Sequence, residues 1–195
     1  MKINIGVSNR HVHLTEQDFK ILFGEGAVLE KMRDLKQPGE FASSAVVTLK
    51  TNKDQIDKVR VLGPFRNYTQ IEISKTDAYK LGLNPPVRES GDIKDSEEII
   101  LVGPIGTVLK QEGCIIANRH IHATPADVEK YKLDSSKKYC IRLKGEKGGV
   151  LNGVSIKVSP NYVWEMHIDT DDANAHLIDN ENNMGEIIGE DHESI

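Results

Sequence analysis

The sequence has few cysteines and no long apolar run. Its 195 residues include two cysteines, Cys114 and Cys140, and no CxxC pair, which excludes a zinc ribbon and a disulfide scaffold. No stretch of about 18 apolar residues occurs, so no transmembrane helix is predicted. The N-terminal stretch MKINIGVSNRHVH lacks the apolar segment of a signal peptide, and we therefore expect a cytoplasmic protein.

The motifs of several common enzyme classes are also absent. The sequence contains no GxGxxG fingerprint, no Walker loop, no GxSxG elbow and no HExxH motif. Alternating strand and helix patterns with helices of about 10–15 residues are missing, which argues against a Rossmann sheet. Many short apolar runs predict instead a mainly β protein, a barrel or a sandwich, with strands at 44–50, 59–63, 99–102, 106–109, 139–143 and 154–158.

Basic residues are absent from the last fifth of the chain. The formal net charge is −5, yet all 25 Lys and Arg residues lie within residues 1–157. Residues 158–195 contain ten acidic residues and no Lys or Arg. The total charge argues against a nucleic-acid binder. The distribution predicts a mildly basic body, compatible with a phosphate-bearing ligand, and an acidic, largely solvated tail within 180–195.

A short repeat is the most informative feature of the sequence. Residues 9–15 read NRHVHLT and residues 118–124 read NRHIHAT, and an aspartate follows three residues later in both copies. A weaker match relates QIEISKTDA at 70–78 to EMHIDTDDA at 165–173, and it places Glu72 opposite His167. Chance is the alternative explanation, especially for the second match. We interpret the chain as two related halves.

The repeat predicts two metal sites. Residues two apart on a strand point to the same face, so His11 and His13 project together, as do His120 and His122. Each third candidate ligand lies on the polar face of an alternating strand, and these candidates are Glu72 and His167. Shells of two histidines with a glutamate, or of three histidines, are known for zinc and leave a position open for water or substrate. Cobalt or manganese remain alternatives for ligands of this type.

Helix-start signals follow these strands. Thr15 with Asp18, and Thr124 followed by Pro125, are typical of helix N-termini, and Thr76 and Thr170 begin similar segments. Arg66 lies six residues before Glu72. A guanidinium presents a planar fork of donors that suits phosphate, so Arg66 is a candidate anion-binding residue, although a solvated surface charge is the alternative.

Four motifs together resemble the phosphate propanoyltransferases, the propanediol-utilisation type of phosphotransacylase. They are SNRHVHL at 8–14, VLGPFRNYTQIEIS at 61–74, NRHIHATP at 118–125 and EMHIDTDDANA at 165–175. The resemblance implies two related β-barrels capped by short helices, with the N-terminal strand incorporated in the C-terminal barrel. Its implied boundaries are 10–117 for the first barrel, 1–9 with 118–188 for the second, and 189–195 for an acidic tail.

The resemblance also implies a reversible reaction in which acyl-CoA and phosphate give acyl phosphate and coenzyme A. It assigns one Zn²⁺ to His11, His13 and Glu72 and a second to His120, His122 and His167. It implies that Arg66 binds phosphate and acts in catalysis. It places Ser8, Asn9, Arg10 and Asn174 near coenzyme A.

The expected partners are therefore acyl-CoA and phosphate, with no nucleic acid and no membrane. Many family members carry an N-terminal extension that directs them to a microcompartment. The first predicted strand here starts at Ile3, so we expect a cytoplasmic enzyme of acetate or propionate metabolism rather than a shell-associated one. The sequence does not determine the oligomeric state or the choice between acetyl and propanoyl groups. The alternatives are a small binuclear metal hydrolase and a non-enzymatic, zinc-stabilised microcompartment protein.

Overall fold

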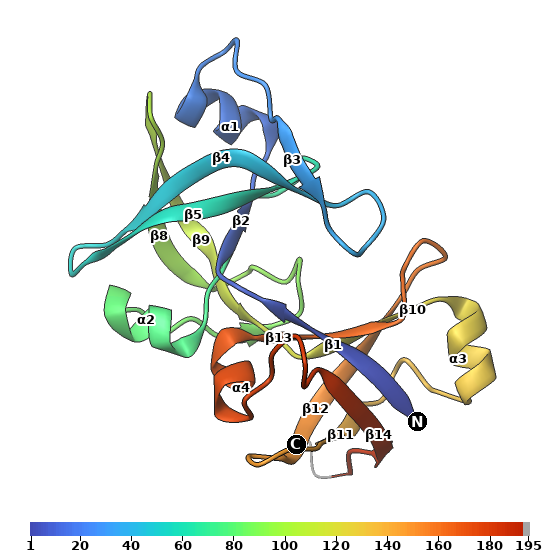
Figure 1. Ribbon diagram of the computed structural model, residues 1–195. Helices are drawn as coiled ribbons and strands as arrows, with labels where there is room; N and C mark the ends of the chain where they lie inside the picture. The colour runs from blue at the N-terminus through green and yellow to red at the C-terminus, as the bar shows by residue number, and fades with distance from the viewer. Residues whose placement is uncertain (193–195) are drawn as a thin grey trace. The chain divides into compact units, whose positions relative to one another are not determined.

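The computed structural model describes residues 1–192 and divides the chain into two compact units (Figure 1). One unit is the continuous segment Asn9–Ala117. The other combines Met1–Ser8 with the chain from Asn118 onward. Each unit is built around its own barrel, so the predicted mainly β fold with two barrels is confirmed.

Six strands close the barrel of the first unit, which we call the N-terminal barrel. Around the ring, each strand is hydrogen-bonded to the next and the last to the first: β2 (His11–His13), β5 (Gln55–Gly63), β4 (Phe41–Lys50), β8 (Glu97–Val102), β9 (Thr107–Ala117) and β6 (Gln70–Glu72). Two short strands pair with strands of this ring without being part of it, β3 (Lys31–Asp34) with β4 and β7 (Val87–Arg88) with β9.

The second unit, the C-terminal barrel, is also a closed ring of six strands. Their order is β1 (Lys2–Ser8), β13 (Glu165–Asp169), β10 (His120–Ala123), β12 (Gly149–Val158), β11 (Tyr139–Leu143) and β14 (Met184–Glu190). Strand β14 extends into the stretch expected to be a solvated tail, because Gly185 and Ile187 are buried where it pairs with β1 and β11. The tail prediction is therefore wrong for 184–190, and residues 193–195 lie outside the described part of the chain.

The two rings have the same pairing pattern. Strand β2 is parallel to β5 and antiparallel to β6, and β10 is likewise parallel to β12 and antiparallel to β13. Strands β6 and β13, which carry Glu72 and His167, each have a parallel neighbour as well. The neighbour of β6 is β9, which directly precedes the HxH strand β10 of the C-terminal barrel. The neighbour of β13 is β1, which directly precedes the HxH strand β2 of the N-terminal barrel. The chain thus exchanges one strand between its two barrels.

Residues 3–13, which are rich in Ile and Val, predict one continuous strand, and this exchange explains why the strand is interrupted. Strand β1 ends at Ser8 and pairs with β13 and β14, whereas β2 begins at His11 and pairs with β5 and β6. Asn9 and Arg10 form the connection between the two barrels, and Asn118 and Arg119 form the same connection in the second copy of the repeat. The Asn-Arg pair of the repeated motif is therefore the junction between the units.

Short helices follow the ligand-bearing strands: α1 (Glu16–Phe23), α2 (Lys75–Leu81), α3 (Pro125–Tyr131) and α4 (Thr170–Ala175). Thr15 and Thr124 are N-caps, as their spacing predicts. The caps of α2 and α4 are Ser74 and Asp169 rather than Thr76 and Thr170, so both helices begin earlier in the chain than the sequence signals predict. No helix in the part of the chain described here is long and apolar enough to cross a membrane.

Each barrel has a separate apolar core, and the strands that carry the candidate ligands contribute residues adjacent to those ligands. Val12 and Ile71 are fully buried in the N-terminal barrel. Ile121 and Met166 occupy the equivalent positions of the C-terminal barrel and are also fully buried. Because alternate side chains of a strand point to opposite faces, burial of these residues fixes the direction in which the histidines project.

Candidate active site

The N-terminal barrel brings together the first predicted metal group. His11 and His13 lie on β2, and Glu72 lies directly opposite His11 on the antiparallel strand β6. The Nε2 atom of His11 is 3.4 Å from Oε2 of Glu72. One candidate ligand atom from each of the three residues lies within 4.8 Å of the others, a spacing at which all three could reach one ion.

The C-terminal barrel contains the equivalent group in the same register. His120 on β10 lies opposite His167 on β13, and His122 is two residues further along β10. The ring of His167 is 5.5 Å from that of His120 and 4.6 Å from that of His122, measured between centroids. Their candidate ligand atoms also lie within 4.8 Å of one another.

One ring nitrogen of the first histidine in each motif is held by the backbone. Nδ1 of His11 is 2.8 Å from the carbonyl oxygen of Asn9, and Nδ1 of His120 is 2.8 Å from that of Asn118. A proton on Nδ1 places the lone pair on Nε2, which is the form that binds a metal. The connections between the barrels thus also orient one candidate ligand of each group.

The histidines of the C-terminal group fit a metal ion. Nδ1 of His122 is buried and has no hydrogen-bond partner within the described residues. Burial lowers the pKa of His120 to about 3, with a contribution from the positive charge of Lys157, and lowers the pKa of His122 to about 2. Both rings are therefore neutral at pH 7. Neutral imidazoles are typical ligands of zinc and similar ions.

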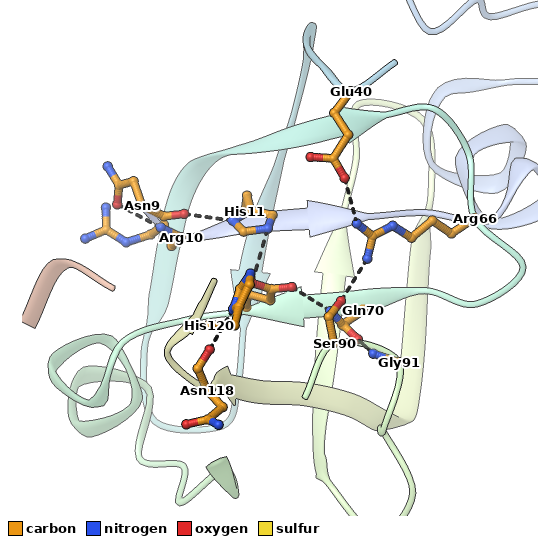
Figure 2. Close-up of polar contacts among 11 residues, drawn as sticks. Asn9, Arg10, His11, Glu40, Arg66, Gln70, Ser90, Gly91, Asn118 and His120 are labelled. Atoms are coloured by element: carbon orange, nitrogen blue, oxygen red, sulfur yellow. Dashed lines mark hydrogen bonds and ion pairs between the residues drawn. The ribbon is translucent and has the colours of Figure 1, made fainter. Parts of the chain in front are cut away.

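Arg66 projects toward polar groups of the N-terminal barrel rather than into bulk solvent (Figure 2). Its Nη1 donates to Oγ of Ser90 at 3.0 Å, and its Nη2 lies 3.4 Å from Oε1 of Glu40. The backbone N–H of Arg66 donates to the carbonyl of Leu14, immediately after the HxH motif, at 2.9 Å. The candidate anion-binding residue is thus anchored close to the ligand strand.

A hydrogen-bond network joins Arg66 to the metal group of the same barrel (Figure 2). The amide Nε2 of Gln70 lies 2.9 Å from Oγ of Ser90 and 2.6 Å from Oε1 of Glu72. The N–H of Gly91 donates to Oε1 of Gln70 at 2.7 Å. The sequence reasoning missed Glu40, Gln70 and Ser90. Gln70 had a detectable signal, because it shares the polar face of its strand with Glu72, whereas Ser90 lies in a segment typical of a turn.

The four residues expected near coenzyme A lie at the junction between the units and on α4. Ser8 ends β1 opposite Asp169, the N-cap of α4, and Asn174 is an exposed residue of that helix. Asn9 is exposed, and its Oδ1 accepts the N–H of Arg10 at 2.8 Å. The guanidinium of Arg10 is bound to Asp77 at 2.9 Å. Ser8 and Asn174 belong to the C-terminal unit, whereas Asn9 and Arg10 belong to the N-terminal one.

Comparison with known proteins identifies one family. A family model described as phosphate propanoyltransferase matches residues 4–179. A phosphate propanoyltransferase of Priestia megaterium is 53% identical over 178 residues, which cover 90% of this chain and 81% of the relative. A relative with the same name from Thermotoga maritima is 44% identical over 95% of this chain and 87% of its own length. Another from Salmonella typhimurium is 42% identical over 96% of this chain and 89% of its own length.

Proposed function

The chain belongs to the phosphate propanoyltransferase family and is thus an acyltransferase, and we propose that it exchanges a short acyl group between coenzyme A and phosphate. In this reaction a phosphate oxygen forms a bond to the acyl carbon, and the bond between that carbon and the sulfur of coenzyme A breaks. The products are an acyl phosphate and the coenzyme A thiol, and the reverse reaction uses the same groups. Propanoyl-CoA and acetyl-CoA are the proposed substrates.

The observation that carries this proposal is the network between Arg66 and Glu72. An anion-binding side chain and a metal ligand of one barrel are joined through only two side chains, Ser90 and Gln70. Arg66 would bind phosphate through its fork of donors and orient one oxygen for attack. The contact to Glu40 is long at 3.4 Å, so a phosphate oxygen can compete for that N–H.

We further propose that each barrel binds one Zn²⁺, at His11, His13 and Glu72 and at His120, His122 and His167. Zinc bound by these residues would supply Lewis acidity toward a thioester carbonyl and affinity for a thiolate. The strands fix the positions of the candidate ligands, and burial keeps the imidazoles of His120 and His122 neutral. Three protein ligands leave a coordination position open, as a catalytic rather than a structural site requires.

Direct attack by phosphate fits the state of Cys114, the more buried of the two cysteines. Its side chain is inaccessible, and burial raises the pKa of its thiol to about 12, with a contribution from Glu97. A neutral, inaccessible thiol is a poor nucleophile. We therefore propose that no acyl-cysteine intermediate forms at Cys114.

Ser8, Asn9, Arg10 and Asn174 are the proposed contacts to coenzyme A. The Arg10 side chain is 37% exposed despite its ion pair with Asp77, so part of the guanidinium remains accessible to a phosphate group. Ser8 and Asn9 are consecutive residues at the junction between the units, and Asn174 is exposed on α4. Each offers a hydroxyl or amide group for hydrogen bonding.

The test is thiol release from propanoyl-CoA and acetyl-CoA with and without phosphate. We expect phosphate-dependent release from the native protein and a loss of at least about 100-fold in Arg66→Ala, since a charge-assisted bidentate contact is removed. Arg33→Ala, an exposed arginine of the same barrel, is the matched control. Phosphate-independent release would favour a hydrolase, and undiminished turnover in Arg66→Ala with native metal content would contradict the role of Arg66.

A further inference from the structure

Glu165 is a buried carboxylate beside the three-histidine group. It lies two residues before His167 on β13, so both side chains project from the same face of the strand. Its Oε2 is 3.1 Å from Nε2 of His167, and only 4% of the residue is exposed. A buried carboxylate is costly unless it is paired and hydrogen-bonded, so its position next to a candidate ligand requires an explanation.

The N-terminal barrel has a corresponding pair. Gln70 lies two residues before Glu72, and the repeat that aligns Glu72 with His167 also aligns Gln70 with Glu165. The Gln70 amide donates to Oε1 of Glu72 at 2.6 Å, and Gln70 is fully buried. Both barrels therefore place a buried polar residue against the third ligand from the same position.

The two pairs differ in a chemically consistent way. A carboxylate ligand accepts hydrogen bonds, and its partner, Gln70, donates one. An imidazole that binds a metal through one nitrogen carries a proton on the other nitrogen and donates it in a hydrogen bond. Its partner here is Glu165, and an ionised carboxylate is purely a hydrogen-bond acceptor. Each pair thus contains one carboxylate. In the N-terminal barrel it belongs to the candidate ligand Glu72, and in the C-terminal barrel it belongs to the partner Glu165.

The surroundings of Glu165 are shaped to hold its carboxylate. Gly6 of β1 pairs with His167, and a Cβ atom at Gly6 would lie 3.2 Å from Cδ of Glu165 and 3.3 Å from its Oε1. Any side chain at residue 6 would therefore press on the carboxylate. The absence of a side chain at Gly6 of the exchanged strand β1 leaves room for the Glu165 carboxylate beside His167.

We propose that Glu165 is a positioning residue of the C-terminal metal site, which accepts the Nε2 proton of His167 and thereby presents Nδ1 of that ring to the metal. The inference rests on the proposed function only in requiring that this site bind a divalent ion. A carboxylate partner fixes the tautomer and the orientation of a metal-bound imidazole and makes it a better ligand, typically by 10–100-fold in affinity. Gln70 has the matching role toward Glu72.

The first experiment measures Zn²⁺ affinity at the C-terminal site alone, by competition with a chromophoric chelator. Glu72→Ala is present in every sample to remove the other site. Adding Glu165→Gln, or Glu165→Asp as a second variant, is expected to weaken binding about 10–100-fold. Glu181→Gln, at an exposed position of the same unit, is the control and is expected to bind like the parent. Circular dichroism and thermal melting verify the fold of each variant.

The outcomes separate the two hypotheses. If the Glu72→Ala parent binds no Zn²⁺, the proposed C-terminal metal site fails, whatever Glu165 does. If this parent binds Zn²⁺ and both folded Glu165 variants bind as tightly, the role of Glu165 alone is overturned. Cobalt spectra provide a second readout. A different coordination number in Glu165→Gln at full occupancy, read from the intensity of the d–d bands, would make Glu165 a direct ligand and would also overturn the positioning role.

A second experiment transfers the pairing to the N-terminal barrel, with the C-terminal site removed by His167→Ala. Glu72→His alone places an imidazole beside the Gln70 amide donor, and we expect weaker Zn²⁺ binding. Adding Gln70→Glu supplies an acceptor, keeps an oxygen for the Gly91 N–H and is expected to restore affinity at least about tenfold. A further loss in the double variant would contradict the matched pairing.

Discussion

Arg119 donates two hydrogen bonds to the carboxylate of Asp172, from Nε to Oδ2 at 2.6 Å and from Nη2 to Oδ1 at 2.7 Å. Arg10 and Asp77 form the equivalent ion pair in the N-terminal barrel, at 2.9 Å. In both copies the arginine precedes the first histidine and the aspartate lies on the helix that follows the third ligand. The ion pair therefore connects the two segments that supply each group of candidate ligands. It also explains why the weaker match of the repeat, QIEISKTDA with EMHIDTDDA, aligns Asp77 with Asp172.

The first prediction concerns the Arg119–Asp172 pair. Asp172→Asn removes the charge of the acceptor, and we expect a loss of about 1–3 kcal/mol in the free energy of unfolding, measured by urea denaturation. The affinity of the C-terminal site for Zn²⁺ should also fall, because β10 and α4 are held less firmly. Asp171→Asn, one residue earlier and outside this ion pair, is the control. Equal losses of stability in Asp172→Asn and Asp171→Asn would refute the stabilising role of the Arg119–Asp172 ion pair.

The second prediction concerns metal stoichiometry. Each ligand group belongs to a single barrel, so the groups should bind independently. Glu72→Ala is expected to reduce bound Zn²⁺ from two ions per chain to one, and His167→Ala should do the same. The double variant should bind none. Elemental analysis after gel filtration measures this directly, and loss of both ions in either single variant would show that the sites depend on each other.

The third prediction concerns Ser90, which connects Arg66 to Gln70. Ser90→Ala removes the oxygen that both donors contact, a loss of roughly 1–2 kcal/mol that corresponds to about a tenfold rise in KM for phosphate. Metal content should not change. Initial rates at varied phosphate concentration measure the effect, with Ser44→Ala at an exposed position of the same barrel as control. An unchanged KM would remove Ser90 from the phosphate site.

The fourth prediction concerns the stability of the metal-free protein at acidic pH. Unfolded histidines take up protons near pH 6.5, whereas the pKa of folded His120 is about 3 and that of folded His122 about 2. The unfolded state binds more protons between these values, so stability must decrease as the pH falls below 6.5. Denaturation with a chelator present should show a loss of roughly 2–4 kcal/mol between pH 6.5 and 5. His122→Gln should reduce the slope, and a pH-independent midpoint would contradict the prediction.

The local features of the site could be predicted from the sequence because they depend on spacing within one strand. The two-residue spacing of the histidines in HxH places both on one face of β2 and likewise of β10. The alternation of polar and apolar residues around Glu72 and His167 places each of them on the polar face of its strand. The N-caps Thr15 and Thr124 are similarly local. The structure brings each set of three candidate ligands together, at the positions that the repeat predicts.

The remaining features depend on tertiary contacts that no local pattern encodes. Glu40, Arg66 and Ser90 come from three separate segments, and their contacts exist only because the barrel places those segments together. The pairing of β14 depends on β1, a strand from the opposite end of the chain, so the acidic composition of 184–190 wrongly indicated a solvated tail. The exchange of β1 followed from the family resemblance and had no signal in the hydrophobic pattern.

The exchanged strand has a consequence for synthesis on the ribosome. Strand β1 is made first, but its partners β13 and β14 begin only at Glu165 and Met184. At translation rates of about 5–20 residues per second, β1 waits roughly 8–30 s for β13 to be made. Ile3 and Ile5, both buried in the finished barrel, remain without their native partners during that time. The nascent chain therefore passes through a stage with an unpaired, apolar strand open to wrong pairing, the hazard that chaperones limit.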